Sequence, residues 1–150
     1  MEFNESAWIK LVFLLADTQA WLDELSSGAL QQPPLENKHK LHRKTYHLGI
    51  AAMAHILEWH YYKIPRHPGT GKFHIPVTHV LDHIREAGNL SPARVPSCLN
   101  FQRVITTSEP VGFDRNGEPA YHITVISGAG GEIITAFPGT VSTNAALSTL

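Results

Sequence analysis

The chain has 150 residues, of which 43% are hydrophobic and 17% are charged. This length and composition indicate a folded globular protein and exclude a predominantly disordered chain. The formal net charge is −1 at pH 7, so no overall positive field attracts the protein to nucleic acid. The single cysteine, Cys98, excludes an internal disulfide and a cysteine-based zinc site.

The first residues do not resemble a secretion signal. Glu2 and Glu5 stand where such a signal carries positive charge, and the apolar stretch from Leu11 to Ala16 is too short to span a bilayer. We therefore expect a soluble protein without a membrane anchor. If it is exported, another segment or another protein has to carry it.

Apolar residues at three- and four-residue steps predict an amphipathic helix over about Ser6 to Ser26. We expect Ser6 to cap its start and Gly28 to follow its end. We expect the helix to pack on the rest of the fold, with docking onto a partner as the alternative. The apolar stripe consists of Trp8, Leu11, Val12, Leu15, Leu22 and Leu25.

Pro33-Pro34 and the polar residues around them predict a linker from Gln31 to Lys40. Residues 1–40 are therefore assigned to an N-terminal helix and linker, and residues 41–150 to the main domain. Within that domain, a second helix is predicted over about Arg43 to Tyr62. We expect it to end before Ile64-Pro65, because a proline disfavours helical backbone in the residue before it.

A loop with two prolines and two glycines follows from Pro65 to Lys72, and then a third helix from Val77 to Ala87, which ends at Gly88. The remainder is rich in β-branched and aromatic residues, and Asn116-Gly117 is typical of a tight hairpin. Helices followed by an antiparallel meander predict the α+β class, with N-terminal helices packed on an antiparallel sheet. The predicted strands are Phe101 to Thr107, Val111 to Asp114, Tyr121 to Ile126 and Glu132 to Phe137, and the tail Gly139 to Leu150 is expected to fray.

The ten histidines are the unusual feature of the composition. His79 and His83 stand four residues apart on the third helix, a spacing at which two imidazoles can share a metal, with His74 or His122 as a third ligand. No acidic residue occupies the adjacent position used by zinc-protease helices. A histidine-ligated metal hydrolase therefore stays an alternative, although we expect no resident metal or other cofactor.

A basic segment surrounds three further histidines. It is either a phosphate-contact patch or a solvated charged face. The segment contains Lys38, His39, Lys40, His42, Arg43, Lys44 and His47.

His55 and His67 stand in contrasting settings, which suggests a division of labour. The second helix can hold the first imidazole rigidly, while the glycine-rich loop lets main-chain amides approach a phosphate at the second. Metal-independent RNA cleavage needs one group to accept the 2′-hydroxyl proton and another to protonate the 5′-oxygen, and two histidines suit both tasks. Lys72 and Thr135 are available to stabilise charge on the pentacovalent phosphorane.

Four segments carry a resemblance to a known family. They are His55-Ile56-Leu57, the run Arg66-His67-Pro68-Gly69-Thr70-Gly71-Lys72, then Phe73 with Ile75-Pro76, and finally Gly131-Glu132-Ile133-Ile134-Thr135-Ala136-Phe137-Pro138. In this order and spacing they resemble the bacterial EndoU nuclease family. Its members are commonly C-terminal toxin domains of contact-dependent inhibition and other polymorphic toxin systems. The resemblance covers about His55 to Pro138.

The resemblance implies an RNase-like fold, with an N-terminal helical part packed against a curved antiparallel sheet. It also implies transesterification that yields a 2′,3′-cyclic phosphate and a free 5′-hydroxyl, and some bacterial members cut tRNA. The catalytic residues implied are His55, His67, Thr135 and Lys72, and the candidate substrate contacts are Arg66, Thr70 and His60.

This chain departs from the family pattern at three places. Trp59-His60 stands where the family usually has Gly-Asp, which makes His60 a rival for one catalytic position. Pro65-Arg66 replaces glycines before the second histidine, and Phe137 stands where a tyrosine is usual.

We therefore expect residues 41–150 to form an EndoU-like endoribonuclease domain of a bacterial toxin. Its expected partners are RNA, with tRNA as one possibility, and a cognate immunity protein. It would act in the cytoplasm of a target bacterium, delivered as part of a larger effector. The alternative is a catalytically weak or inactive RNA- or protein-binding module of the same fold.

Overall fold

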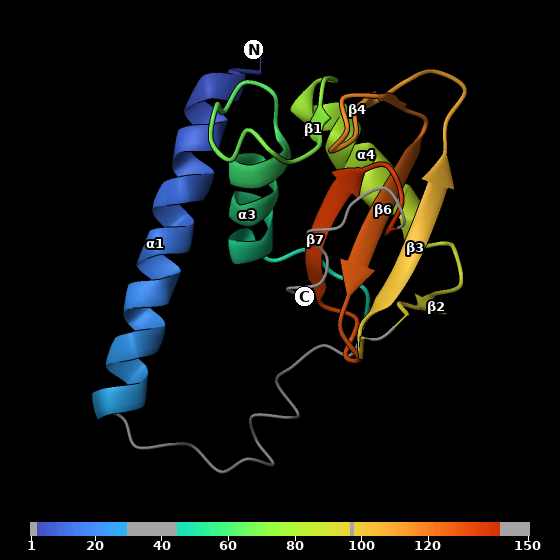
Figure 1. The fold of residues 1–150 in the computed structure, drawn as a ribbon. Coiled ribbons are helices and arrows are strands. Elements are labelled where there is room, and N and C mark those ends of the chain that lie inside the picture. The colour runs from blue at the N-terminus through green and yellow to red at the C-terminus, as the bar shows by residue number, and fades with distance from the viewer. Residues whose placement is uncertain (1–2, 30–44, 97, 142–150) are drawn as a thin grey trace.

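The computed structural model describes residues 3–29, 45–96 and 98–141. Helices dominate the first part of this chain and antiparallel strands the second, so the predicted α+β class is confirmed (Figure 1). The elements in chain order are α1 (Glu5–Ala29), α3 (Ile50–His60), β1 (Lys72–Phe73), α4 (Val77–Ala87), β2 (Ala93–Arg94), β3 (Phe101–Thr106), β4 (Gly112–Phe113), β5 (Pro119–Ala120), β6 (His122–Ser127) and β7 (Ile133–Pro138).

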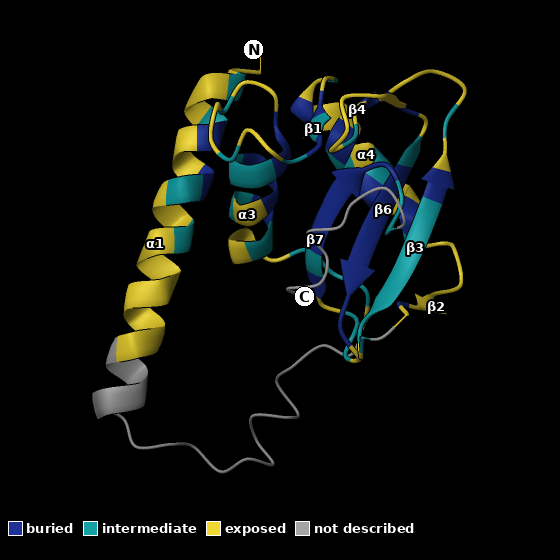
Figure 2. Ribbon diagram, in the orientation of Figure 1, coloured by how far each residue is buried: buried dark blue, intermediate teal, exposed yellow. Residues whose placement is uncertain are grey.

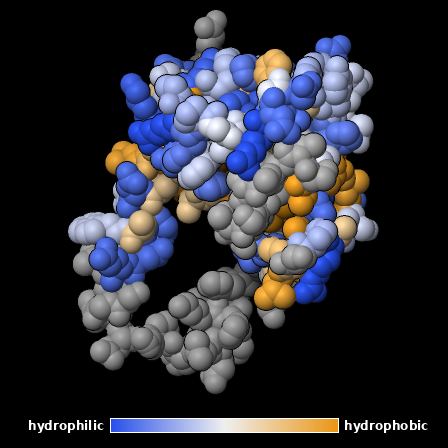
Figure 3. Space-filling view, viewed as in Figure 1, coloured by the Kyte–Doolittle hydropathy of each residue, from blue (hydrophilic) through white to orange (hydrophobic). Residues whose placement is uncertain are grey.

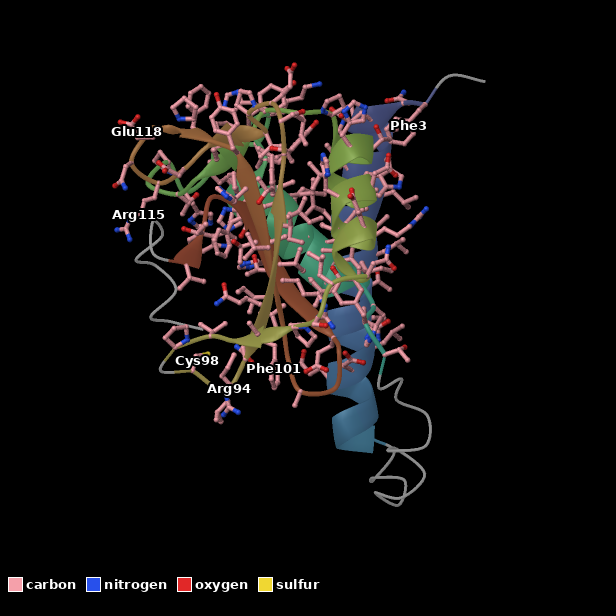
Figure 4. All side chains as sticks on the ribbon, turned by 90° about the vertical axis from the view of Figure 1, so that its right-hand side faces the viewer. Phe3, Arg94, Cys98, Phe101, Arg115 and Glu118 are labelled. Carbon is pink, nitrogen blue, oxygen red and sulfur yellow. The ribbon has the colours of Figure 1, made fainter. Side chains whose placement is uncertain are left out.

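The main sheet has four antiparallel strands in the order β2-β3-β6-β7. A smaller antiparallel sheet has the order β1-β4-β5. The ladder between β6 and β7 shifts register at Ile126/Ser127, close to the glycine-rich turn that joins the two strands. At the opposite edge of the sheet, where β2 pairs with β3, the guanidinium of Arg94 lies 5.7 Å from the ring centre of Phe101 (Figure 4).

Helices pack against the main sheet at two places. In Figure 1, α4 lies behind the sheet, where it contacts β3 and β6, and α3 lies beside the edge strand β7. The strands β6 and β7 are buried along most of their length (Figure 2). The apolar core between these layers includes Ile56, Leu57, Tyr61, Phe73, Val77, Val80, Ile84, Ile123, Val125 and Ala136.

The bounds of α4 are those predicted from the sequence. Val77, Val80, Ile84 and Ala87 recur on one face and are all buried, as expected for an amphipathic helix on a sheet. The main-chain N–H of Gly88 donates to the carbonyl of Arg85, which closes the last turn.

The start of α1 differs from the prediction. The helix begins at Glu5, and Oδ1 of Asn4 accepts a hydrogen bond of 3.0 Å from the N–H of Ala7. Asn4, not Ser6, is therefore the N-cap, because asparagine accepts from the free N–H groups of a first turn as well as serine does. The expected end is also wrong, since α1 continues through Gly28 to Ala29.

Among residues 5–24 of α1, whose side chains are described, those that pack on the domain lie in the first part of the helix (Figure 2). Ile9 and Val12 are buried with Met53 of α3, whereas Leu11, Leu15 and Leu22 of the predicted stripe are 49%, 40% and 47% exposed. The physical reason is length: at about 1.5 Å per residue, a 25-residue helix extends far beyond the 11-residue α3. Figure 3 shows that residues 17–24 of α1, the part of its second half whose side chains are described, stand clear of the domain.

The second helix begins later than predicted, at Ile50 instead of Arg43. Residues 45–48 instead run along the start of β7, where the N–H of His47 donates to Gly131 and the N–H of Ile133 donates to His47. His47 therefore has a main-chain role, and its ring Nδ1 contacts the carbonyl of Thr45. The predicted linker and the rest of the basic segment lie outside the described residues.

The strands predicted from the sequence all occur, with ends that differ by a residue or two, and Asn116-Gly117 lies in the turn between β4 and β5. Three two-residue strands, β1, β2 and β5, were not predicted, because segments so short have no periodicity. Of the tail, residues 139–141 are packed, since Gly139 accepts a hydrogen bond from Thr124 and Val141 contacts a small apolar cluster. Residues 142–150 lie outside the described chain.

The division at residue 40 stays a prediction, although Ile9 and Val12 belong to the same core as α3. Within the described ranges, none of the helices has the length and apolar character needed to cross a bilayer.

Candidate active site

Trp59, near the C-terminal end of α3, contacts both predicted catalytic histidines. The rings of His55 and Trp59, one helical turn apart, have centres 5.8 Å apart. The ring of His67 stacks on the same indole with a centre distance of 3.4 Å and an interplanar angle of 1°. His55 is exposed, and the His67 side chain is 34% exposed. Two imidazoles from separate segments therefore share one aromatic support and both reach solvent.

Glu58 links α3 to the loop that carries His67. Its Oε1 accepts a hydrogen bond of 2.8 Å from Arg66 Nη1, and its Oε2 lies 3.4 Å from His67 Nε2. Partial burial would raise the pKa of Glu58, but the hydrogen bonds from Arg66 and His67 outweigh it and lower that pKa. The carboxylate is thus ionised at neutral pH and can pair with a protonated His67.

The carbonyl of Trp59 holds the other end of this loop. It accepts 2.7 Å and 2.6 Å hydrogen bonds from Lys72 Nζ and Thr70 Oγ1. Lys72 Nζ also donates to the carbonyl of Arg66 at 2.5 Å. The last carbonyls of a helix lack partners within the helix, so Lys72 and Thr70 satisfy one of them and close the loop on α3.

Two consequences follow for the predicted roles of these residues. The hydroxyl proton of Thr70 is directed at main-chain carbonyls, of Trp59 and His67, so only its lone pairs remain for a ligand. An ammonium group has three N–H donors, and Lys72 uses two of them on carbonyls. Burial lowers the pKa of Lys72. One donor is left for a phosphate oxygen.

His67 has a main-chain conformation that side chains rarely adopt. Its φ is +53°, in the left-handed region, and the N–H of Thr70 donates to its carbonyl in the turn that follows. Strained residues of this kind cluster at functional sites, where the surrounding structure holds them. Here the stacked indole of Trp59 and the carboxylate of Glu58 fix the ring.

His55 is electrostatically suited to accept a proton. Although the residue reaches solvent, partial desolvation by its neighbours lowers its pKa, Glu58 partly offsets this by raising it, and His67 lowers it further. The ring is therefore neutral at pH 7, with a lone pair available.

His60 lies beneath the exposed His55. It is 7% exposed, its Nδ1 is 2.9 Å from the carbonyl of Gly71, and its ring centre is 6.2 Å from that of His55. Burial lowers its pKa to about 4, so the ring is neutral and its Nδ1 donates to Gly71. The predicted substrate contact and rival catalytic role thus fall on a residue that supports the site from within.

Thr135 is the one predicted catalytic residue whose reactive atom lies below the surface. The residue is 2% exposed, and its hydroxyl is buried without a hydrogen-bond partner. On the same face of β7, two residues along, Phe137 is fully buried and its ring centre lies 5.9 Å from that of His60.

The register of α3 against β7 places Thr135 at the level of His55. The two elements run side by side in the same direction (Figure 1), and the contact of His60 with Phe137 marks one level. The five residues from His60 back to His55 along the helix and the two residues from Phe137 back to Thr135 along the strand both cover about 7 Å. Thr135 therefore lies at about the same level along α3 as His55, and its hydroxyl is buried.

Two residues of the site, Glu58 and Trp59, were not among the site residues predicted from the sequence. Both lie one turn after His55, at the i+3 and i+4 positions that share its side of the helix. That spacing, beside a second histidine close in sequence, was the available signal. The tyrosine expected by the family pattern is replaced by Phe137, which is buried.

The alternative of a histidine-ligated metal site requires at least three ligand side chains close together. Among the described residues, no three histidine, cysteine, aspartate or glutamate side chains are grouped as metal ligands. The nearest acidic contact of His83 is Glu86, 3.7 Å away.

No protein-family model, curated protein or solved structure matches this chain. The class established is thus the α+β fold itself, and the assignment of a function rests on the residues described above.

The hydroxyl of Thr135 has no hydrogen-bond partner, and the effect of removing it on stability can be compared with that of removing the bonded hydroxyl of Thr124. A buried hydroxyl without a partner costs about 1–3 kcal/mol, whereas one that is bonded contributes about 1 kcal/mol. Thr135→Val should therefore leave the free energy of unfolding unchanged or raise it. Thr124→Val should lower it by about 1–2 kcal/mol, because Thr124 Oγ1 donates to the carbonyl of Gly139. Urea unfolding compares the two, and equal losses would contradict the assignment.

His60 should make the protein sensitive to acid. Its pKa is about 4 in the folded chain and has an ordinary value near 6.5 when unfolded, so acid protonates the unfolded chain first. Its contribution is full above pH 6.5 and is lost as the pH falls toward 4, on the order of 2–3 kcal/mol. Urea unfolding at several pH values should show a shallower decline for His60→Gln. The exposed control His79→Gln should follow the parent curve, and an unchanged slope in His60→Gln would refute the assignment.

Proposed function

We propose that this protein is a metal-independent endoribonuclease, with His55 and His67 as the proton-transfer pair. The observation that carries the proposal is the convergence of these two solvent-accessible imidazoles on the indole of Trp59. An imidazole can accept or donate a proton, so two histidines can act as base and acid in one reaction.

The electrostatics favour one division of roles. His55, neutral because of its lowered pKa, accepts the proton from the 2′-hydroxyl. The 2′-oxygen then forms a bond to phosphorus, the bond from phosphorus to the 5′-oxygen breaks, and His67 donates its proton to that oxygen. Glu58 supports a protonated His67 by pairing with it. The products are a 2′,3′-cyclic phosphate and a 5′-hydroxyl.

Charge on the phosphorane needs a donor that is already in place. Lys72 meets this need, because two main-chain carbonyls fix its ammonium group and one N–H donor stays available. Thr135 enters the proposal through the resemblance alone, since its hydroxyl is buried. Arg66 is exposed at the rim of the loop and can contact a neighbouring phosphate.

The biological setting is proposed from the EndoU resemblance. It comprises a toxin domain within a larger effector, action in the cytoplasm of a target bacterium, tRNA as a candidate substrate and neutralisation by a cognate immunity protein. The near-neutral net charge favours a local phosphate site over broad electrostatic capture of RNA.

The decisive test replaces the two histidines one at a time. His55→Ala and His67→Ala should each lower kcat/KM for a labelled single-stranded RNA by about 10²- to 10⁴-fold, the usual cost of losing a general acid or base. The assay contains a chelator, in which the parent should keep its full activity. His79→Ala, which removes an exposed histidine from α4, serves as the matched control and should cleave like the parent.

The thermal unfolding midpoint of each variant separates lost chemistry from lost folding. Parent-like cleavage by the protein with both histidines replaced would refute the proposal. RNA binding by the parent without any cleavage would favour the alternative, an inactive binding module of the same fold.

A further inference from the structure

Three aromatic rings next to the proposed catalytic residues remain unused by that chemistry. We call Tyr62, His74 and Phe113 the aromatic cluster. The rings of Tyr62 and His74 are stacked, with centres 4.8 Å apart and planes at 25°. Phe113 meets His74 edge-on at 5.1 Å and 86°. Tyr62 and Phe113 are 40% and 43% exposed, and His74 is exposed as well.

His74 contacts both other rings of the aromatic cluster, and all three residues reach solvent. Core packing does not require them, because the neighbouring Tyr61 and Phe73 are almost completely buried and fill the space beneath. Adjacent exposed rings offer flat π surfaces, which is the form that single-stranded nucleic acid recognition uses for its bases.

The main chain fixes the position of the aromatic cluster relative to the catalytic group. Residues 60–62 run beside residues 71–74: Nδ1 of His60 contacts the carbonyl of Gly71, and the N–H of Tyr62 donates to the carbonyl of Phe73. Lys72 and His74 lie two residues apart on β1 and its extension, so their side chains leave the same side of the strand about 7 Å apart.

The second strand of the small sheet completes the arrangement. Phe113 of β4 is the register partner of Lys72, so its ring reaches the aromatic cluster from the side opposite α3. Nζ of Lys63 lies 5.6 Å from the ring centre of Tyr62. Lys63 is paired with Glu5, and Arg115 and Glu118 lie at the tip of the β4–β5 hairpin (Figure 4).

We propose that the aromatic cluster is a base-stacking subsite, which holds a nucleobase of the RNA strand next to the phosphate at His55 and His67. This inference rests on the proposed function, which identifies the bound nucleic acid as RNA. Its location follows from the shared path of residues 60–62 and 71–74. Because stacking uses the π face and not hydrogen-bonding edges, the subsite should tolerate different bases.

The test measures binding without cleavage. The probe is a fluorescein-labelled single-stranded RNA of mixed sequence, 2′-O-methylated throughout, so that no 2′-hydroxyl is free to attack. Tyr62→Ala should weaken its Kd by about fivefold to a hundredfold, the range for loss of one stacked base. Tyr62→Trp should retain binding. Trp21→Ala removes a ring from α1 that is 60% exposed and should bind like the parent.

A second probe series identifies the contact as stacking. One abasic nucleotide is moved along the same oligonucleotide. The parent should bind the oligonucleotide more weakly when the abasic nucleotide occupies one or two particular positions. In Tyr62→Ala this dependence on position should disappear. Equal affinity of Tyr62→Ala and the parent, an abasic effect that persists in Tyr62→Ala, or no binding by the parent would each overturn the subsite.

The two proposals fail separately. If cleavage depends on His55 and His67 but Tyr62→Ala binds like the parent, the subsite alone is wrong. If the parent binds through Tyr62 but no RNA is cleaved, the subsite stands and the nuclease assignment is wrong.

Discussion

The candidate site depends on one main-chain carbonyl, that of Trp59 in the last turn of α3. Lys72 and Thr70 both donate to it, so the free end of the helix and the glycine-rich loop are tied together at one point. The same residue supplies the indole on which His67 stacks. Helix end, loop and imidazole are therefore fixed relative to one another, and His55, one turn back on α3, needs no further support.

This arrangement explains why a buried histidine lies at the centre of the site. His60 donates to Gly71 at the start of β1, and its neutral ring fills the space between α3 and Phe137 of β7. A charged ring there would pay a desolvation cost without a counter-charge, which is why burial lowers its pKa so far. The residue that sequence reasoning placed in contact with substrate instead connects the helix to the sheet.

The elements with strong periodicity could be predicted from the sequence. The buried face of α4 and its terminal Gly88 defined that helix, and the β-branched runs of β6 and β7 defined their strands. The extent of α1 packing could not be predicted, because it depends on the length of α3. Nor could the burial of His60 and Thr135, since a sequence does not show which side of an edge strand a helix covers. His55 and His67 were selected from their contrasting settings and from the resemblance, and the structure adds Trp59, which contacts both rings, and Glu58, which contacts His67.

The chemistry of the RNA ends tests the central claim most directly. Total RNA incubated with the purified protein in a chelator would be analysed for both new termini by end-specific ligation and mass spectrometry. Acid–base catalysis by two imidazoles predicts fragments with 2′,3′-cyclic phosphate and 5′-hydroxyl ends, absent when both histidines are replaced. Fragments with 5′-phosphate ends, or cleavage that the chelator abolishes, would contradict the account.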